Sequence, residues 1–197
     1  MNIILKVLLK INNKIKYWNY KRKLNNCLTN GLSLGRNVTI MPGAFIDPQY
    51  SFLISIGDNC SLSNGVIILA HDASTYKFTN GYTRIGIVKI KDNCYIGTNA
   101  IILPGVTIGP NVLIAAGSLV NKSIPPNSCV AGVPARVYSK FDEFIKHHEE
   151  VIKLRPSFDY KDFNSPNNDF KEKIKKMLDE DQIYVKGFDG KFPWTNT

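Results

Sequence analysis

The sequence has few cysteines for its length, and they lie far apart. Cys27, Cys60, Cys94 and Cys129 form no CxxC pair, and the N-terminal residues show no secretory cleavage pattern. This spacing excludes a zinc knuckle and a secreted disulfide framework. A chain of 197 residues can bury a sizeable core without disulfides. We therefore expect reduced thiols and a cytoplasmic protein.

Acidic residues are absent from the first 26 positions, where seven lysines and arginines lie. These seven account for most of the formal net charge of +9, so the rest of the chain carries only +2. A nearly balanced body argues against a nucleic-acid-binding domain, and no nucleic-acid partner is expected.

The N-terminal segment also lacks an apolar run long enough to cross a bilayer, because Ile3–Leu5 is far short of the ~20 residues required. Apolar side chains recur there at helical steps, which predicts a basic amphipathic helix over residues 1–26: Ile4, Leu8, Ile11, Ile15 and Trp18. Two interpretations stay open. The helix packs on its own domain or a neighbouring subunit, or residues 1–24 contact an anionic membrane peripherally at its inner face.

What the sequence does contain is a six-residue repeat. An aliphatic residue stands at every sixth position in three runs: Leu34, Ile40, Ile46; then Ile56, Leu62, Ile68; then Ile90, Ile96, Ile102, Ile108, Ile114, Val120. Four residues after each of these comes a second position, usually small or β-branched, which makes Cys60 and Cys94 core fillers. No helix or ordinary strand has this period.

The position three after each aliphatic residue is asparagine or glycine in nine of twelve cases: Asn37, Gly43, Asn59, Gly65, Asn93, Asn99, Gly105, Asn111 and Gly117. Both residue types tolerate positive φ, so these positions are predicted corners. Flat stretches joined by corners indicate a prism-shaped parallel β-helix, with one aliphatic and one small side chain inward per face. The repeat alone shows neither its handedness nor how many faces make a coil.

Three corner positions depart from this rule: Gln49, Ser123 and His71. Gln49 precedes a four-residue slip in register, and Ser123 is predicted to close the repeat. His71 precedes the longest break, because 22 residues separate Ile68 from Ile90. A loop of about residues 72–84 must leave the prism there. An outward imidazole beside such a loop, the only histidine of the repeat, is a candidate general base.

The segments IGDNCSLSNGVIILAHDAS, YIGTNAIILPGVTIGPNVLIAAGSLV and AGVPARV resemble the hexapeptide-repeat acyltransferases over about residues 32–138. The resemblance implies an all-β fold, a left-handed parallel β-helix with three faces per coil, although left-handed crossovers break the usual chirality rule. It also implies a homotrimer with active sites between adjacent subunits. The HDAS segment, the following loop and the tail are most similar to O-acetyltransferases of surface-polysaccharide synthesis.

The resemblance assigns catalytic roles to individual residues. It makes His71 the general base that takes a proton from a sugar hydroxyl. Asp72 is expected to hold the tautomer of the imidazole, although an adjacent side chain can equally face solvent. Asp47 is expected to bind the acceptor hydroxyl or the histidine of a neighbour, or merely to cap a turn.

The cosubstrate implied by the resemblance is acetyl-CoA. Its pantetheine arm is expected to lie on backbone at Thr98 and Ala116, where small residues permit close approach. Asn121, Lys122 and Arg136 are expected near the nucleotide, where cations suit the phosphates. No metal is expected.

Residues 139–197 are predicted to form a helical extension. The pattern indicates one helix from Phe141 to a stop at Pro156 and a second around Phe170–Leu178. Ile183–Phe188 is predicted to be a short strand or an extended arm.

The favoured function is therefore an acetyl-CoA-dependent O-acetyltransferase acting on a surface polysaccharide or its precursor. An N-acetyltransferase for an amino sugar or another small acceptor would use the same base and cofactor groove. A non-enzymatic β-helix scaffold is a further alternative. A zinc carbonic anhydrase on the same prism needs several histidines on the repeat, and this chain has one.

Overall fold

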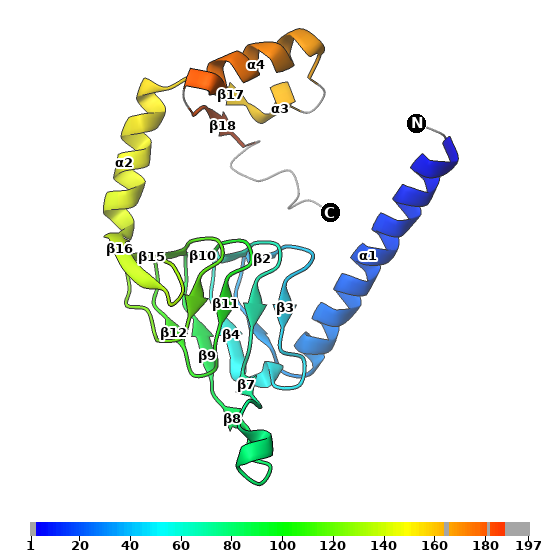
Figure 1. Ribbon diagram of the computed structural model, residues 1–197, viewed down its shortest axis with the longest axis vertical. Helices are drawn as coiled ribbons and strands as arrows, with labels where there is room; N and C mark the ends of the chain where they lie inside the picture. The colour runs from blue at the N-terminus through cyan, green and yellow to red at the C-terminus, as the bar shows by residue number, and fades with distance from the viewer. Residues whose placement is uncertain (1–2, 164–165, 181, 188–197) are drawn as a thin grey trace. The chain divides into compact units, whose positions relative to one another are not determined.

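The structure is a computed structural model that describes residues 3–163, 166–180 and 182–187. The chain divides into two compact units, Met1–Phe141 and Asp142–Thr197. The first unit contains an N-terminal helix, α1 (Ile3–Thr29), and a parallel β-helix from which one hairpin projects (Figure 1).

Three parallel sheets form the sides of the β-helix, and each is named here by its first strand. The β1 sheet contains β1 (Ser33–Leu34), β4 (Ile54–Ile56), β9 (Val88–Ile90) and β12 (Thr107–Ile108). The β2 sheet contains β2 (Thr39–Ile40), β5 (Ser61–Leu62), β10 (Cys94–Ile96), β13 (Val112–Ile114) and β15 (Ser128–Ala131), with β16 (Arg136–Lys140) antiparallel at its edge. The β3 sheet contains β3 (Phe45–Ile46), β6 (Ile67–Ile68), β11 (Ile101–Ile102) and β14 (Leu119–Val120).

Register explains why the six-residue period builds a core. Ile96 pairs with Leu62 on one side and with Ile114 on the other, so the inward side chains of successive coils stack. Each face alone buries too little apolar surface to fold, and stacking supplies the rest. Most of the predicted aliphatic positions are fully buried, together with Cys60 and Cys94.

All nine predicted corners have positive φ, as the asparagine and glycine pattern indicated. One corner also carries a ladder of side-chain amides. Asn37 donates to Asn59 over 2.9 Å, Asn59 to Asn93 over 3.2 Å, and Asn93 to Asn111 over 3.2 Å. The asparagines therefore satisfy the backbone conformation and link consecutive coils.

The prediction that Ser123 closes the repeat is wrong. Ile124 still bridges to Ile108, and Asn127 makes a further corner at φ 56° before β15. Val112 pairs with Cys94, eighteen residues earlier, and with Ser128, sixteen residues later. The last coil is thus shorter, which moves its corner out of the six-residue register.

The break after Ile68 is a hairpin of β7 (His71–Asp72) and β8 (Arg84–Ile85), with the short 3-10 helix η2 (Tyr76–Phe78) at its tip. His71 pairs with Ile85, so it is an extended strand residue rather than a corner with positive φ. Gly86 then donates to the carbonyl of Ala70 over 2.9 Å, and this bond returns the chain to the prism.

Helix α1 contacts the first coil through its C-terminal third. The Tyr20 hydroxyl donates to the carbonyl of Ile40 over 2.5 Å, the Cys27 thiol donates to that of Ile46 over 3.7 Å, and Leu24 packs on the core. A second 3-10 helix, η1 (Ser51–Leu53), lies against the end of α1 through the Ser51 hydroxyl, which donates to Cys27 over 3.2 Å. No helix in the described part of the chain is long and apolar enough to cross a membrane.

The second unit is largely helical. It contains α2 (Phe141–Leu154), β17 (Ser157–Asp159), α3 (Tyr160–Phe163), α4 (Asn168–Glu180) and β18 (Tyr184–Lys186). Strands β17 and β18 pair in parallel, and three phenylalanine rings pack edge to face beside them: Phe158, Phe163 and Phe170. The expected strand at Ile183–Phe188 is β18, and Phe188 lies outside the described residues.

Candidate active site

The imidazole of His71 contacts the carboxylate of Asp47, 24 positions earlier in the chain. Nδ1 of His71 is hydrogen-bonded to Oδ2 of Asp47. Asp47 directly follows β3, and its backbone N–H donates to the carbonyl of Ile68 over 2.9 Å. The stacking of β3 on β6 therefore sets this carboxylate beneath the first residue of the hairpin.

Asp47 is buried and its oxygens are fully engaged. Its exposed fraction is 1%, and Oδ2 also accepts the N–H of Ala70 over 3.1 Å while Oδ1 accepts that of Gln49 over 3.2 Å. Buried carboxylates require such donors, because an unpaired buried charge is costly. The side chain is consequently held in one orientation.

This arrangement decides which nitrogen of His71 can act as a base. An ionised carboxylate can only accept a hydrogen bond, so Nδ1 carries the hydrogen and Nε2 retains a free lone pair. The His71 side chain remains 31% exposed, whereas the Asp47 side chain is buried. A neutral imidazole with Nε2 unprotonated, oriented by a buried carboxylate and reachable from solvent, can accept a proton from a hydroxyl.

Two further residues pack around the pair. The Tyr50 ring lies 5.1 Å from the His71 ring between centroids, inclined at 45°. The Cys27 thiol, which comes from α1, is the second. Its burial raises its pKa, and the nearby charge of Asp47 raises it further. The thiol therefore stays protonated near neutral pH and adds no negative charge beside Asp47.

Asp72 does not hold the imidazole, which corrects the sequence prediction. Its Oδ1 accepts the N–H of Ser74 over 2.9 Å and its Oδ2 accepts Arg84 over 3.1 Å. The hydrogen bond from Ser74, followed by the charge of Arg84, holds the pKa of Asp72 below its usual value. Because strand neighbours point to opposite sides, Asp72 closes the base of the hairpin while His71 faces Asp47.

The residues expected to contact the pantetheine arm lie on adjacent coils. Gly117 donates to the carbonyl of Thr98 over 2.8 Å, which places Ala116 one coil above Thr98, and both side chains are exposed. The coils approach closely here, since a Cβ on Gly97 would lie 2.5 Å from the nitrogen of Ala116. This corner precedes the β3 sheet, whereas His71 follows it.

The residues expected at the nucleotide follow β14, in the same sheet as β6. Asn121 and Lys122 are exposed at this edge, two strands from His71, or roughly 10 Å at the usual strand spacing. Arg136 begins β16, and its neighbour Ala135 donates to the carbonyl of Leu119 over 2.8 Å. In one chain, His71 and Lys122 thus lie beyond the carboxyl ends of the β3-sheet strands, and Thr98 lies before their amino ends.

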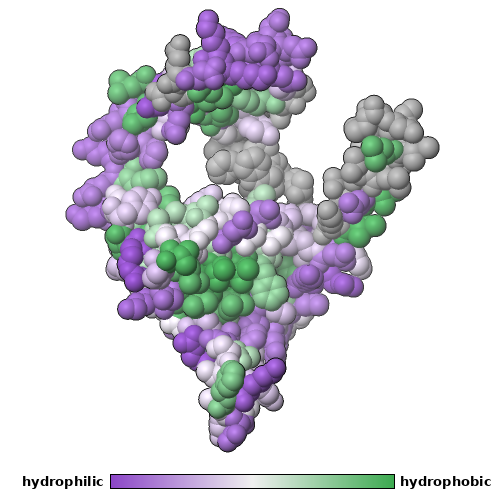
Figure 2. All heavy atoms as spheres, viewed as in Figure 1, coloured by the Kyte–Doolittle hydropathy of each residue, from purple (hydrophilic) through white to green (hydrophobic). Residues whose placement is uncertain are grey.

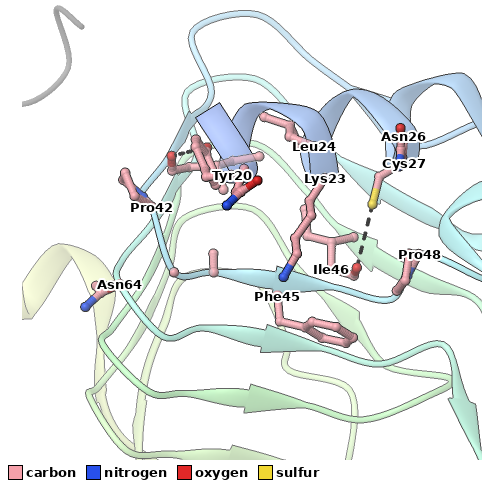
Figure 3. Close-up of a pocket in the computed structure, with 14 residues that line it drawn as sticks. Tyr20, Lys23, Leu24, Asn26, Cys27, Pro42, Phe45, Ile46, Pro48 and Asn64 are labelled. Carbon is pink, nitrogen blue, oxygen red and sulfur yellow. Dashed lines mark hydrogen bonds between the residues drawn. The ribbon is translucent and has the colours of Figure 1, made fainter. Parts of the chain in front are cut away.

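A pocket of about 800 Å³ lies between α1 and the first coil (Figure 3). Its walls are largely apolar, and Lys23 extends from α1 toward the strand that bears Phe45. Ile46 and Pro48 line it, but Asp47 and His71 do not. The pocket therefore shares Cys27 with the surroundings of the imidazole, but neither member of the Asp47–His71 pair lines it.

Within residues 3–163, 166–180 and 182–187, no group of three histidine, cysteine or acidic side chains is placed to hold a metal ion.

Two family models match the chain. "Bacterial transferase hexapeptide (six repeats)" matches residues 87–122, and "Hexapeptide repeat of succinyl-transferase" matches residues 54–70. Both matches fall on the stacked coils.

Several known proteins are similar to this chain. Galactoside O-acetyltransferase of Escherichia coli (strain K12) is 36% identical over 119 residues, which cover 59% of this chain and 58% of that enzyme. A protein of Bacillus subtilis (strain 168) named "Putative acetyltransferase YvoF" is 33% identical over 127 residues, covering 64% and 67%. The crystal structure of a hexapeptide-repeat acetyltransferase from Vibrio cholerae O1 biovar eltor, complexed with acetyl-CoA, has a TM-score of 0.50 at 27% identity, covering 55% and 59%.

The matched region thus spans somewhat more than half of the Escherichia coli enzyme and two thirds of the Bacillus subtilis protein. The stacked six-residue coils, the two family models and these identities agree, and the chain belongs to the hexapeptide-repeat acetyltransferase family, whose repeat forms a left-handed β-helix.

Proposed function

We propose that the protein is an acetyl-CoA-dependent O-acetyltransferase in which His71 is the general base for a sugar hydroxyl of a surface polysaccharide or its precursor. The observation that carries this proposal is the hydrogen bond from His71 Nδ1 to the buried carboxylate of Asp47. A hydroxyl acceptor is supported by the name of the Escherichia coli relative, galactoside O-acetyltransferase. Acetyl-CoA as the donor is supported by the Vibrio cholerae complex.

The chemistry needs one proton acceptor at the attacking oxygen. Nε2 of His71 takes the hydroxyl proton while the oxygen attacks the thioester carbonyl, and a carbon–oxygen bond forms. The carbon–sulfur bond then breaks, and the imidazolium returns the proton to the CoA thiolate. Asp47 stabilises the transient imidazolium and keeps the ring from rotating. Such a base contributes roughly 10² to 10⁴ in rate, and positioning of the two substrates supplies the remainder.

Acetyl-CoA is proposed to lie with its pantetheine arm along Thr98 and Ala116 and its phosphates near Asn121, Lys122 and Arg136. Two exposed cations support this placement: Lys122 at the carboxyl end of the β3 sheet and Arg136 at the start of β16. Arginine can pair with a phosphate through two parallel hydrogen bonds, and lysine provides a point charge.

A homotrimer with active sites between subunits is proposed as the working assembly. The outward side chains of the β3 sheet are apolar, and Figure 2 shows them gathered over the strands near β3 and β11. Phe45 is exposed, and Ile67, Ile101 and Leu119 are half-buried beside it. A contiguous apolar surface of this kind is typical of a subunit interface. A cytoplasmic location is proposed as well, and four free, buried cysteines support it.

The test measures release of the CoA thiol from acetyl-CoA with a panel of galactosides, glucosides and amino sugars, and identifies the product by mass spectrometry. We expect transfer to a sugar oxygen. Transfer to amino groups alone would overturn the O-acetyl assignment. If the protein showed neither turnover nor CoA binding by calorimetry, the result would favour the non-enzymatic scaffold.

The cofactor placement has its own test. Lys122→Ala and Arg136→Ala are expected to raise KM for acetyl-CoA more than KM for 3′-dephospho-acetyl-CoA, because the variants lose a partner for a phosphate that the second compound lacks. Lys89→Ala, which removes an exposed lysine of β9, is the matched control and leaves both values unchanged. Equal effects on the two donors would contradict the placement of the 3′-phosphate.

A further inference from the structure

Helix α1 has apolar side chains on two opposite faces. At about 100° per residue, Tyr20, Leu24 and Cys27 lie together on the face that contacts the first coil. Ile11, Ile15 and Trp18 lie on the opposite face, with exposed fractions of 49%, 53% and 62%. The helix therefore has two apolar stripes instead of the expected one. The side chains of Ile4 and Leu8, which belong to the expected stripe, are not among those that the structure describes.

The outer face, defined here as Ile11, Ile15 and Trp18, is not covered by the protein's own β-helix. Interpreting α1 as a helix packed only on its own domain explains Tyr20, Leu24 and Cys27 but leaves these three large side chains in solvent. Because they lie together on one helix face, they form an apolar patch, and such a patch favours a partner with an apolar layer.

The charge around the outer face selects the partner. Residues 1–46 contain no acidic side chain, and Lys14, Lys21 and Arg22 are exposed beside the outer face. The Arg22 guanidinium lies 5.3 Å from the centroid of the Trp18 ring. A second copy of α1 would bring equally positive charge to the same face, so repulsion opposes pairing of two such helices.

We infer that α1 is a peripheral anchor for an anionic lipid surface. The helix lies in the plane of the membrane, with Ile11, Ile15 and Trp18 at the boundary of headgroups and acyl chains. Lys14, Lys21 and Arg22 meet the lipid phosphates, and a tryptophan is well suited to this depth. The inference is independent of the proposed activity, because its measurement is binding alone.

The first test is co-sedimentation of the 197-residue chain with vesicles of phosphatidylcholine, with and without phosphatidylglycerol. We expect binding to the anionic vesicles that falls as salt is raised, since screening shortens the Debye length to about 3 Å at about 1 M. Lys14→Gln with Lys21→Gln is expected to weaken binding at least tenfold, because each cation near an anionic surface contributes roughly a fivefold factor. Lys89→Gln with Lys91→Gln removes the same charge from β9 and its following turn, and should leave binding unchanged.

The second test concerns the apolar layer. Ile11→Asn with Ile15→Asn should abolish binding, whereas Ile145→Asn with Ile152→Asn, two exposed isoleucines of α2, should not. Trp18 fluorescence, read in a Trp194→Phe background that leaves it the only tryptophan, should be quenched by brominated lipid. Salt-independent binding, equal binding to neutral vesicles or unquenched Trp18 fluorescence would overturn the inference. A change in subunit number with unchanged vesicle binding would instead identify the outer face as a subunit contact.

Discussion

Replacing Asp47 by asparagine removes the negative charge beside His71 with little change in volume. The carboxylate accepts three N–H groups, from Gln49, Ala70 and His71, whereas an amide has one accepting oxygen. If the amide NH₂ takes the place of Oδ2, Nδ1 of His71 becomes the acceptor, Nε2 carries the hydrogen, and the N–H of Ala70 faces another donor. If it takes the place of Oδ1, His71 keeps its tautomer and the N–H of Gln49 faces another donor. Both arrangements remove the negative charge that stabilises the imidazolium.

The expected magnitudes follow from these two arrangements. With Nε2 protonated the base is lost, which costs roughly 10² to 10⁴ in kcat, or roughly 3 to 5 kcal/mol of transition-state stabilisation. One unsatisfied buried donor lowers the free energy of unfolding by about 1 to 3 kcal/mol. The Asp47→Asn protein should therefore fold, bind acetyl-CoA normally and turn over slowly.

Steady-state kinetics with acetyl-CoA and the best sugar of the panel measure this loss, and calorimetry measures CoA affinity. Asp72→Asn is the control, because Asp72 contacts Ser74 and Arg84 and should change kcat by less than about tenfold. If Asp47→Asn kept activity within a small factor of wild type, or if Asp72→Asn lost as much, the orienting role of Asp47 would be refuted.

Three further predictions concern stability and are measured by chemical denaturation. Asn93→Ala should lower the free energy of unfolding by about 2 to 3 kcal/mol, because it loses two ladder hydrogen bonds and places alanine at φ 57°; Asn93→Gly, which tolerates that φ, should lose less. Burial, with a smaller contribution from Tyr17, raises the pKa of Tyr20 to about 12 from an ordinary value of 10.0. The protonated Tyr20 hydroxyl therefore stabilises the fold fully below about pH 10, and this stabilisation is lost as the pH rises toward 12. Tyr20→Phe should cost about 1 kcal/mol at neutral pH and show a smaller alkaline loss than wild type, and an equal alkaline loss would assign the transition to other groups. The Ser118 hydroxyl is buried without a hydrogen-bond partner among the described residues, so Ser118→Ala should raise stability by about 1 kcal/mol, whereas Ser128→Ala, which loses a bond to Pro126, should lower it.

The six-residue period and its corners were predictable because each is a local requirement. An inward aliphatic side chain must recur once per face, and asparagine or glycine must stand where φ is positive, as Asn93 and Gly105 do. The same logic misplaced the end of the repeat at Ser123. The final coil is shorter, so Asn127 makes a corner that the fixed period cannot anticipate.

The sequence offered Asp47 as a partner for the histidine of a neighbouring subunit, but its pairing with His71 of the same chain was not predictable in the same way. Asp47 meets it because Ile46 pairs with Ile68, and that pairing depends on three faces per coil and on the four-residue slip between them. The repeat gives neither quantity. Sequence proximity favoured Asp72 instead, although adjacent strand residues face opposite ways. Likewise, the helical spacing of apolar residues in α1 predicted the stripe that contains Ile11, Ile15 and Trp18. Only the structure shows that this stripe is exposed and that a different face of α1 packs on the first coil.

The most direct test of the central claim compares wild type with His71→Ala in acetyl transfer, with CoA affinity measured on the same preparations. The proposal predicts a fall in kcat of roughly 10² or more at unchanged CoA affinity, since the base is lost and the donor site is intact. Transfer by His71→Ala at the wild-type rate, or a wild-type protein that binds CoA but acetylates no acceptor, would contradict it.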